Sequence, residues 1–428
     1  MHVTSADQIQ FQDHHLIVPA MPTIPFIAGD GIGPEIMSST RAVLEEAVNR
    51  VYHGQRAIKW LELFAGEAAV SRTGSWLPDE TLAGLKKHLV AIKGPLATQV
   101  GGGASSINVM IRRELDLYAC QRPVRFLSGV KSPLRRPEKI DIILFRENTE
   151  DVYAGIEFAE SSIDNAGFLE FLKGQFPQQY SKLRFPGSSA IAVKPISSEG
   201  SKRLVRAAVR WALANHRHRL TLVHKGNIMK ATEGGFVRWG YEVAEMEFAG
   251  NVYTMNAYKK TRAEKGEMAA KQDLEEAIDK GLLIVEDLIA DAMFQAAILR
   301  PQEFDVIATT NLNGDYLSDA FAACVGGLGI SPGANVNYET GAAVFEATHG
   351  TAPELAGKNL ANPVSLILSG VMLLRYLGWS EAAEIVVQAV EKAFAQGVMT
   401  SDLVEPGETG LTTSVFTRQL IDTVRGAE

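Results

Sequence analysis

Five side chains suited to binding carboxylates lie between residues 94 and 146, near a run of three glycines at 101–103. They are Ser106, Asn108, Arg112, Arg122 and Arg146. An arginine guanidinium is permanently charged, and its planar N–H donors match a carboxylate with two parallel hydrogen bonds. Asn108 and Arg112 share one face of a helix that begins after Ser106, where the helix dipole also favours negative charge. The pattern predicts a site for a ligand with several carboxylates, although each arginine taken singly could be a surface or interface residue.

Two pairs of aspartates are each spaced four residues apart, Asp287 with Asp291 and Asp315 with Asp319. On a helix such a pair shares one face, where the two charges repel unless a cation neutralises them. The second pair follows an apolar strand and a loop at 311–314, which is where α/β proteins place ligands. Carboxylate oxygens suit Mg2+ or Mn2+, so we expect a divalent metal there. Ordinary helix acids on a solvated face are the alternative, and it applies most to Asp287.

Two residues, Tyr153 and Lys225, are candidates for proton transfer, because each lies in a polar segment just after an apolar strand. Partial desolvation at such a place would lower the pKa of Lys225, and the Tyr153 hydroxyl could donate a proton. A surface lysine and a half-buried tyrosine are the more common roles of these residue types.

The elements that must position these residues alternate between strand and helix patterns. The expected strands cover residues 23–28, 58–63, 89–92, 140–145, 190–193, 220–223, 282–285, 305–308 and 343–345. This alternation predicts an α/β chain with a parallel or mixed sheet and with ligands at the carboxyl ends of strands. The first strand runs into a glycine-rich turn and then a helix with Pro34 in its first turn. Its glycines are spaced GxGxG rather than GxGxxG, which disfavours a Rossmann dinucleotide site.

A polar stretch interrupts the alternation between residues 158 and 187. It carries a group of apolar side chains, which are Phe168, Leu169, Phe171, Leu172 and Phe176. An exposed apolar cluster on such an excursion often packs against another chain. We therefore expect a subunit contact there.

Composition narrows the class of protein. A chain of 428 residues is long enough for two or three domains. The net charge of -8 and the pI near 5.7 argue against binding to nucleic acid or to an acidic membrane. Only two cysteines are present, Cys120 and Cys324, which is typical of a reducing compartment. The first 20 residues have no signal-peptide pattern, and the most apolar helix candidate, 363–377, is too short to span a bilayer, so we expect a cytoplasmic protein.

Several motifs, taken together and in order, resemble one family. They are GDGIGPE at 29–35, GPL at 94–96, SINV at 106–109, FRENTEDVYAG at 145–155, HKGNIMK at 224–230, NLNGDYLSD at 311–319 and EATHGTAP at 346–353. These motifs look like those of the isocitrate/isopropylmalate dehydrogenases, a family of β-decarboxylating dehydrogenases, and within it like the bacterial isocitrate dehydrogenases. The resemblance runs from about residue 24 to residue 383.

The resemblance implies a two-domain, non-Rossmann α/β fold with a dimer clasp. A large domain would comprise residues 1–117 and 329–428, a small domain residues 118–151 and 196–328, and the clasp residues 152–195. It also implies a homodimer whose active sites are shared between subunits.

The resemblance further implies a role for each candidate. Isocitrate would be held by Ser106, Asn108, Arg112, Arg122 and Arg146. Tyr153 and, from the other subunit, Lys225 would transfer protons. Asp315, Asp319 and the other subunit's Asp291 would bind Mg2+ or Mn2+. The cofactor would contact Thr98, His349, Gly350, Thr351, Ala352, Glu354, Leu355 and Asn362.

The expected reaction is oxidative decarboxylation of isocitrate to 2-oxoglutarate and CO2. In relatives that use NADP, a Lys-Tyr pair follows the EATHGTAP motif, and a Tyr and an Arg further on bind the 2'-phosphate. Those positions here are Glu354, Leu355, Ser401 and Glu405. A carboxylate accepts hydrogen bonds from the free ribose hydroxyls of NAD and repels a 2'-phosphate, so we expect an NAD-dependent isocitrate dehydrogenase. Arg300 remains as a possible partner for a phosphate.

The alternatives are an NADP-dependent isocitrate dehydrogenase, an isopropylmalate or homoisocitrate dehydrogenase, and a non-catalytic regulatory subunit. Polar Ser106 and Asn108 disfavour a pocket for an alkyl tail. The presence of every expected metal and proton-transfer residue disfavours a regulatory subunit.

Overall fold

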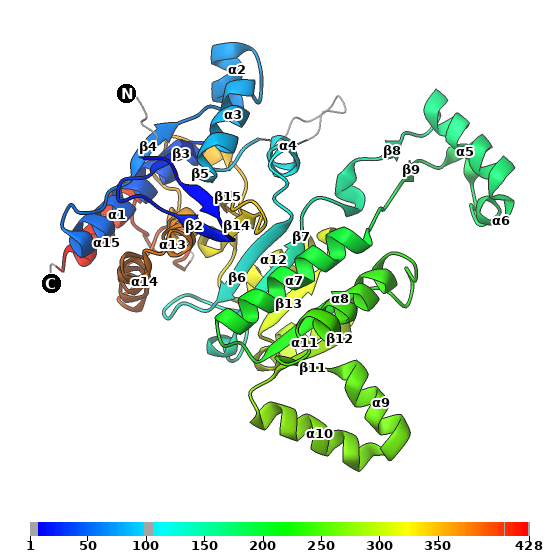
Figure 1. Ribbon diagram of the computed structural model, residues 1–428. Coiled ribbons are helices and arrows are strands. Elements are labelled where there is room, and N and C mark those ends of the chain that lie inside the picture. Colours follow the sequence, from blue (N-terminus) through cyan, green and yellow to red (C-terminus); the bar gives the residue numbers. More distant parts are fainter. Residues whose placement is uncertain (1–6, 98–105, 406, 427–428) are drawn as a thin grey trace.

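The computed structural model describes residues 7–97, 106–405 and 407–426, and a mixed sheet of 11 strands lies at its centre (Figure 1). In spatial order the strands are β11 (Val252–Thr254), β12 (Leu283–Ile289), β10 (Arg219–His224), β13 (Val306–Thr309), β7 (Asp141–Glu147), β6 (Ala119–Arg125), β14 (Pro332–Val336), β15 (Ala343–Ala347), β5 (Val90–Lys93), β3 (Thr23–Ile27) and β4 (Lys59–Glu62). Pairing is parallel from β11 to β7 and from β15 to β4. It is antiparallel from β7 through β6 and β14 to β15, so the strand direction changes in the middle of the sheet.

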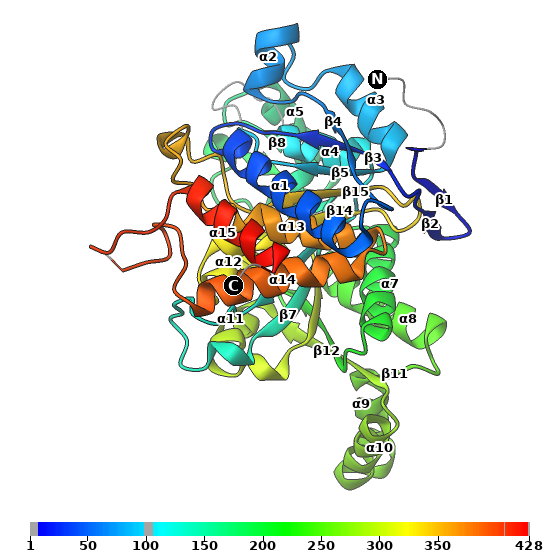
Figure 2. The ribbon, with the colours of Figure 1, turned by 90° about the vertical axis from the view of Figure 1, so that its left-hand side faces the viewer.

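Both ends of the chain build the half of the sheet from β14 to β4. Its main helices are α1 (Gly33–Tyr52), α13 (Val364–Tyr376), α14 (Ser380–Ala395) and α15 (Thr413–Arg425). In α1 the buried side chains recur every three or four residues, as in Val43, Leu44 and Ala47, which turns one apolar face to the core. Figure 2 shows α1, α14 and α15 packed side by side. A separate apolar cluster packs α3 (Asp79–His88) and α4 (Ile107–Glu114) against the sheet, while α2 (Glu67–Thr73) lies further out.

The other half, from β11 to β6, is covered by helices from the middle of the chain. A first core cluster contains α7 (Ser198–Ala214) and α8 (Glu233–Glu247), and a second contains α11 (Ala290–Leu299) and α12 (Asn311–Cys324). The Ser197 side chain caps α7 by accepting a hydrogen bond from the Gly200 backbone N–H at 2.9 Å.

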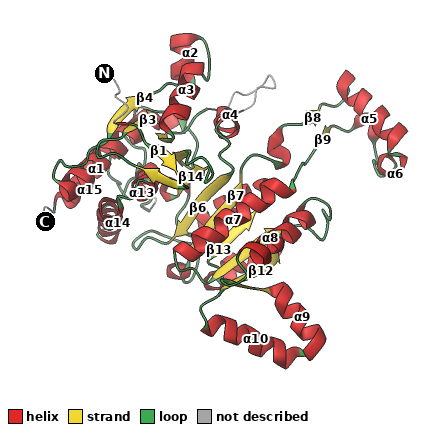
Figure 3. Cartoon of the chain, viewed as in Figure 1, coloured by secondary structure: helices red, strands yellow, loops and turns green. Residues whose placement is uncertain are grey.

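Two segments project from the sheet (Figures 1 and 3). The first contains β8 (Glu157–Phe158), α5 (Ile163–Gln175), α6 (Pro177–Tyr180) and β9 (Ile191–Ala192), and β8 pairs antiparallel with β9. The second is a helical hairpin of α9 (Met255–Lys265) and α10 (Glu267–Asp279). A short hairpin of β1 (Gln10–Gln12) and β2 (His15–Ile17) precedes β3. Among the described helices, none has both the length and the apolar character needed to cross a membrane.

The predicted fold class is confirmed, because the structure is an α/β fold around a large mixed sheet. Each expected strand is present, although the one at 190–193 is reduced to the two residues of β9. Strands β6, β14 and β11 of the central sheet were missed, as were the short strands β1, β2 and β8 outside it. Pro123 and two polar residues interrupt the apolar pattern of β6, and β14 begins with Pro332 and Gly333. These strands form where their neighbours supply the pairing partners, which the local sequence does not reveal.

The glycine-rich turn after β3 packs against two other loops. The Asp30 N–H donates to the Pro95 carbonyl oxygen at 2.7 Å, and the Ile32 N–H donates to the Thr351 carbonyl oxygen at 2.9 Å. Gly31 has φ of +59°, and a Cβ atom placed on it would lie 2.1 Å from the Thr351 carbonyl oxygen. The turn therefore needs glycine for close backbone packing.

Gly31→Ala should lower the free energy of unfolding by about 2–4 kcal/mol, because it adds both a left-handed alanine and a backbone clash. Gly54→Ala is the matched control, since Gly54 also has positive φ but a Cβ there meets nothing within 4 Å. The control should lose only about 1 kcal/mol. Urea unfolding of the two variants measures the difference, and equal losses would show that the contact with Thr351 contributes nothing.

Candidate active site

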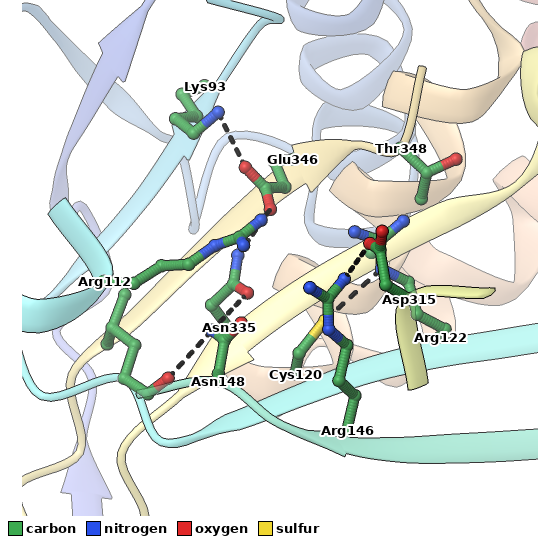
Figure 4. Close-up of polar contacts among 12 residues, drawn as sticks. Lys93, Arg112, Cys120, Arg122, Arg146, Asn148, Asp315, Asn335, Glu346 and Thr348 are labelled. Carbon is green, nitrogen blue, oxygen red and sulfur yellow. Dashed lines mark hydrogen bonds and ion pairs between the residues drawn. The ribbon is translucent and has the colours of Figure 1, made fainter. Parts of the chain in front are cut away.

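A buried carboxylate, that of Glu346 on β15, lies at the centre of the site (Figure 4). Its Oε2 atom pairs with Lys93 Nζ at 2.6 Å, and its Oε1 atom pairs with Arg112 Nη2 at 2.8 Å. Asn335 Nδ2 donates to the same Oε1 atom at 2.7 Å, and Asn148 Nδ2 donates to the Asn335 amide oxygen at 2.9 Å. One side chain thereby joins strands β5, β14 and β15, helix α4 and the segment after β7.

Positive charge exceeds negative charge at this centre. Burial opposes the ionisation of Glu346, but Lys93, Arg112 and the nearby Arg122 hold the pKa of Glu346 well below its usual range. Burial lowers the pKa of Lys93 although Glu346 opposes that shift, whereas the pKa values of Arg112 and Arg122 are raised and both stay charged. One ionised carboxylate therefore faces two permanent cations as well as Lys93. The excess positive charge favours an anionic ligand.

Helix α4 presents two polar atoms that have no partner among the residues that the structure describes. Asn108 and Arg112 lie on this helix, and Ser106 occupies the N-cap position expected for it, although its hydroxyl forms no capping hydrogen bond with the first turn of α4. Within the described part of the chain, Asn108 Oδ1 and Arg112 Nε are buried without a hydrogen-bond partner. A buried polar atom in this condition is destabilising until a ligand or water satisfies it. The pair is therefore suited to contact a polar ligand.

Arg122 extends from β6, one of the strands that sequence reasoning missed. Its side chain is buried, and its Nε atom donates to the Cys120 Sγ atom at 3.3 Å (Figure 4). Among the described residues, no hydrogen bond is made by its two terminal nitrogens. Burial opposes its charge, but the neighbouring Cys120 and Glu346 raise the pKa of Arg122, so it stays charged. These nitrogens can bind a carboxylate bidentately.

Arg146, at the carboxyl end of β7, contacts the first turns of α12. Its Nε atom donates to Asn311 Oδ1 at 2.9 Å, and its Nη1 atom pairs with an Asp315 oxygen. The Tyr153 hydroxyl donates to the other Asp315 oxygen at 2.9 Å, and the Arg146 guanidinium carbon lies 4.9 Å from the centre of the Tyr153 ring. Burial and the negative charge of Asp315 raise the pKa of Tyr153 despite Arg146. Tyr153 is therefore protonated and able to donate at neutral pH.

The three expected metal ligands lie on two different helices, Asp315 and Asp319 on α12 and Asp291 on α11. Asp315 and Asp319 lie one turn apart on α12, as their spacing predicted, and desolvation together with the charge of Asp315 raises the pKa of Asp319. The expectation that Asp287 and Asp291 share a helix face was wrong, because Asp287 lies on strand β12. Asp291 lies in the first turn of α11 and forms an ion pair with Lys225. In the described residues of this single chain, no three acidic, histidine or cysteine side chains converge on one point. Two adjacent carboxylates fit the oxygen ligands that Mg2+ prefers, and further ligands would come from substrate, water or a second subunit.

The expected cofactor residues follow β15 and precede α13. His349 Nε2 is buried and, among described residues, has no partner, while burial lowers the pKa of His349 and keeps the ring neutral. Asn362 Nδ2 donates to Asp402 Oδ2 at 3.0 Å. Glu354 and Leu355 lie in a single 3-10 turn, Pro353–Leu355, where the Glu354 side chain is exposed. Thr98, also expected at the cofactor, lies outside the described residues.

Sequence reasoning missed part of this site, namely Lys93, Asn148, Asn335 and Glu346. A usable signal was present for two of them. Lys93 ends the strand VAIK and Glu346 lies inside the strand AVFEA, and a charged residue in an otherwise apolar buried strand must have a partner. The amides carry no such signal, because their roles depend on distant residues.

The fold and the site together define an α/β protein that concentrates basic side chains where two halves of a mixed sheet meet. Residues 23–424 match the isocitrate/isopropylmalate dehydrogenase family, and the chain belongs to that family. A protein of Staphylococcus epidermidis named isocitrate dehydrogenase [NADP] is 49% identical over 423 residues, which is 98% of this chain and 100% of the relative. A protein of the same name from Streptococcus mutans is 51% identical over 417 residues, covering 97% and 99% of the two chains.

Solved structures agree with this assignment. The crystal structure of isocitrate dehydrogenase from Methylococcus capsulatus has a TM-score of 0.74 and 33% identity, and the match covers 94% of this chain and 99% of that one. The TT0538 protein from Thermus thermophilus also has a TM-score of 0.74, with 32% identity, over 99% of this chain and 71% of that one.

The prediction of an NAD-dependent enzyme was wrong, because relatives that share about half of their residues with this chain are named for NADP. The prediction depended on the carboxylate of Glu354 and on the absence of the Lys-Tyr pair, the Tyr and the Arg at residues 354, 355, 401 and 405. In the structure Glu354 is exposed to water, which screens its charge, and Glu405 is paired with Lys131 at 2.5 Å. Neither carboxylate therefore presents an uncompensated buried charge that would exclude a phosphate.

Glu346→Gln should lower the free energy of unfolding at pH 7 by about 3–5 kcal/mol, because it leaves Lys93 and Arg112 buried without a counter-ion. Since the folded pKa of Glu346 lies below its ordinary value of 4.5, the wild-type carboxylate stabilises the fold above that pH and loses this effect as the pH falls through its folded pKa. The gap between wild type and variant should therefore narrow on acidification below pH 4.5.

Urea unfolding at several pH values tests this expectation. Glu391→Gln, which breaks the more exposed pair between Glu391 and Arg125, is the control and should cost less than about 1 kcal/mol. A Glu346 variant no less stable than the control would contradict the central role of this carboxylate.

Proposed function

We propose that this chain is an NADP-dependent isocitrate dehydrogenase, which oxidises isocitrate and releases 2-oxoglutarate and CO2. The observation that carries the proposal is the set of buried basic groups around Glu346 together with the unpartnered Asn108 and Arg112 atoms. Isocitrate offers three carboxylates and a hydroxyl, which match such a set of donors. The names of the Staphylococcus and Streptococcus relatives support both the substrate and the cofactor.

In this proposal the substrate is held by Ser106, Asn108, Arg112, Arg122 and Arg146. Arg122 has two terminal nitrogens available for a bidentate contact with a carboxylate. Arg146 is already paired with Asp315, so it would contact the substrate and orient this carboxylate at the same time. Ser106 and Asn108 would bind polar atoms of the substrate from the amino end of α4, where the helix dipole favours an anion.

Proton transfer is assigned to Tyr153 and Lys225. The raised pKa of Tyr153 keeps its hydroxyl protonated, so it can protonate the carbon left by CO2 loss. Lys225 contacts Asp291 and makes no contact with Tyr153 in the described structure, which agrees with its acting on the substrate of the partner subunit.

The proposed metal site, like the pair of proton-transfer residues, takes side chains from both subunits, and the cofactor site lies beside it. Asp315 and Asp319, with Asp291 of the partner subunit, would hold Mg2+ or Mn2+. His349, Gly350, Thr351, Ala352, Glu354, Leu355, Asn362 and Thr98 would line the NADP site. When bound, NADP would supply the hydride acceptor, and the metal ion would supply a Lewis acid for the C2 oxygen of the substrate. The buried, unpartnered His349 Nε2 atom fits a ligand hydrogen bond at this place.

A homodimer is part of the proposal, with a large domain of residues 1–117 and 329–428, a small domain of residues 118–151 and 196–328, and a clasp of residues 152–195. The clasp carries exposed apolar side chains, among them Ile163 at 92% exposure and Phe185 at 63%. Such side chains would be covered by the same segment of a second subunit. The free, buried Cys120 and Cys324 suit a reducing cytoplasm.

Initial rates of the purified protein with Mg2+ test the reaction. We expect turnover of isocitrate with formation of 2-oxoglutarate and CO2, and a higher kcat/KM with NADP than with NAD. Turnover that favours NAD would overturn the cofactor assignment. Turnover of isopropylmalate or homoisocitrate in place of isocitrate would overturn the substrate, and no turnover of any of them would indicate a regulatory subunit.

Tyr153→Phe should reduce overall isocitrate turnover by about 10²- to 10⁴-fold while reducing the NADPH-dependent reduction of oxalosuccinate much less, because the hydroxyl acts after hydride transfer. Tyr241→Phe is the control, since the Tyr241 hydroxyl also donates to an aspartate, Asp287, at 2.6 Å, but lies on α8. Equal losses in both reactions of Tyr153→Phe would contradict the role of this residue.

A further inference from the structure

A buried charge cluster lies beside the site and has no part in the reaction described above. It consists of Asp151, Lys194 and Glu233. Lys194 Nζ pairs with Glu233 Oε1 at 2.6 Å and with Asp151 Oδ1 at 3.0 Å. Glu233 is fully buried and Asp151 is 1% exposed. Two buried carboxylates with one cation are costly to maintain unless further hydrogen bonds satisfy their oxygens.

The further hydrogen bonds of Glu233 reach two segments of the candidate site. Its Oε2 atom accepts from the Lys225 backbone N–H at 2.5 Å and from Asn313 Nδ2 at 2.8 Å. Its Oε1 atom also accepts from the Thr310 hydroxyl at 3.4 Å. Glu233 therefore connects the start of the 225–232 loop to the first turn of α12.

Asp151 also contacts the first turn of α12. It accepts a hydrogen bond from the Leu312 backbone N–H at 3.0 Å and one from the Val152 backbone N–H at 2.7 Å. Its φ angle is +72°, in the left-handed region that a residue other than glycine rarely adopts. Its own N–H donates to the Pro195 carbonyl oxygen at 2.9 Å. These bonds hold an unfavourable backbone conformation two residues before Tyr153.

Lys194 is the cation that both carboxylates share. Burial alone would lower the pKa of Lys194, but its hydrogen bond to Glu233 and the charge of Asp151 raise it above the ordinary value, so the amine remains charged. Lys194 lies where the projecting segment returns to the sheet, next to Ile191–Ala192. The cluster therefore also fixes the root of that segment.

Two proposed proton-transfer residues and one proposed metal ligand are each close to this cluster or to a residue bonded to it. Tyr153 follows Asp151, Asp315 follows Asn313, and Lys225 is itself bonded through its backbone to Glu233. The segments that carry these groups are held by the same buried charges. Asp151 accepts from the Leu312 N–H, and Glu233 accepts from the Asn313 side chain and the Lys225 N–H. In the proposed dimer Tyr153 and Asp315 serve the site of their own subunit, whereas Lys225 serves that of the partner subunit. A small shift of the Lys225 loop relative to α12 would therefore misplace groups in both active sites.

We propose that Glu233 is a positioning residue, which sets the place of the Lys225 loop relative to the first turn of α12 through the buried Asp151–Lys194–Glu233 cluster. The importance of these segments for catalysis rests on the function proposed above. The arrangement of the cluster does not.

Glu233→Gln tests the inference, because the amide keeps the size of the side chain but loses the charge that pairs with Lys194. We expect kcat for isocitrate to fall about 10- to 100-fold, while KM changes less than about threefold because Arg112 and Arg122 lie on other elements. Glu233→Asp keeps the charge and should recover part of the loss. Asp305→Asn is the matched control, since Asp305 also holds an arginine, Arg217 at 2.8 Å, and a backbone N–H, that of His218 at 2.7 Å, but lies at the opposite end of β13.

Amide hydrogen exchange without substrate gives a second readout that does not depend on the reaction. Glu233→Gln should exchange faster than wild type at residues 225–232 and 311–315, whereas Asp305→Asn should leave those segments unchanged. If Glu233→Gln does not fold, Asn313→Ala, which removes one donor to Glu233, should show the same two effects in weaker form.

The inference is overturned if exchange in both segments is unchanged in Glu233→Gln, or if its kcat falls no more than that of Asp305→Asn. A wild-type protein that does not turn over isocitrate would instead overturn the proposed function. In that case faster exchange in both segments would still support the positioning role, and unchanged exchange would still reject it.

Discussion

The ionised Glu346 carboxylate on β15 is the interaction on which the rest of the site depends. It pairs with Lys93 from β5 and with Arg112 from α4, and it accepts a hydrogen bond from Asn335 on β14. A buried cation without a counter-ion is strongly destabilising, so these side chains can be gathered only around a carboxylate. Because the basic groups outnumber this one acid, the same arrangement that is stable in the core also attracts an anion.

A second set of charges organises the other side of the site. Arg146 joins the end of β7 to Asn311 and Asp315 on α12. The Asp151–Lys194–Glu233 cluster bonds to the first turn of the same helix and connects it to the root of the projecting segment. The two sets of charges come from the two halves of the sheet, and β6, with Arg122, runs between them. In the proposed enzyme, substrate carboxylates would bridge the two sets.

The choice between NAD and NADP was not decided by the charge of a single motif residue. The Glu354 carboxylate was predicted to select against a 2'-phosphate, but the relatives named for NADP share about half of their residues with this chain over nearly its full length. An exposed carboxylate is screened by water, and a neighbouring lysine such as Lys131 can neutralise another. Selectivity between the two cofactors therefore depends on the summed field of all nearby charges, and no single position in a motif determines it.

The sequence by itself determined the fold class and most of the strands, because alternating apolar patterns and turn residues are local properties. It also determined the faces that pair Asn108 with Arg112 and Asp315 with Asp319, since the helical repeat sets them. The site residues themselves remain predictions, though the structure places Arg112 beside Arg122 and Tyr153 beside Asp315. Only the tertiary structure decided how charges are partnered: that Glu346 neutralises Lys93 and Arg112, and that Glu233 holds Lys225 and Asn313. Such partners are separated by tens to hundreds of residues, and burial fixes their pairing only once the chain has folded.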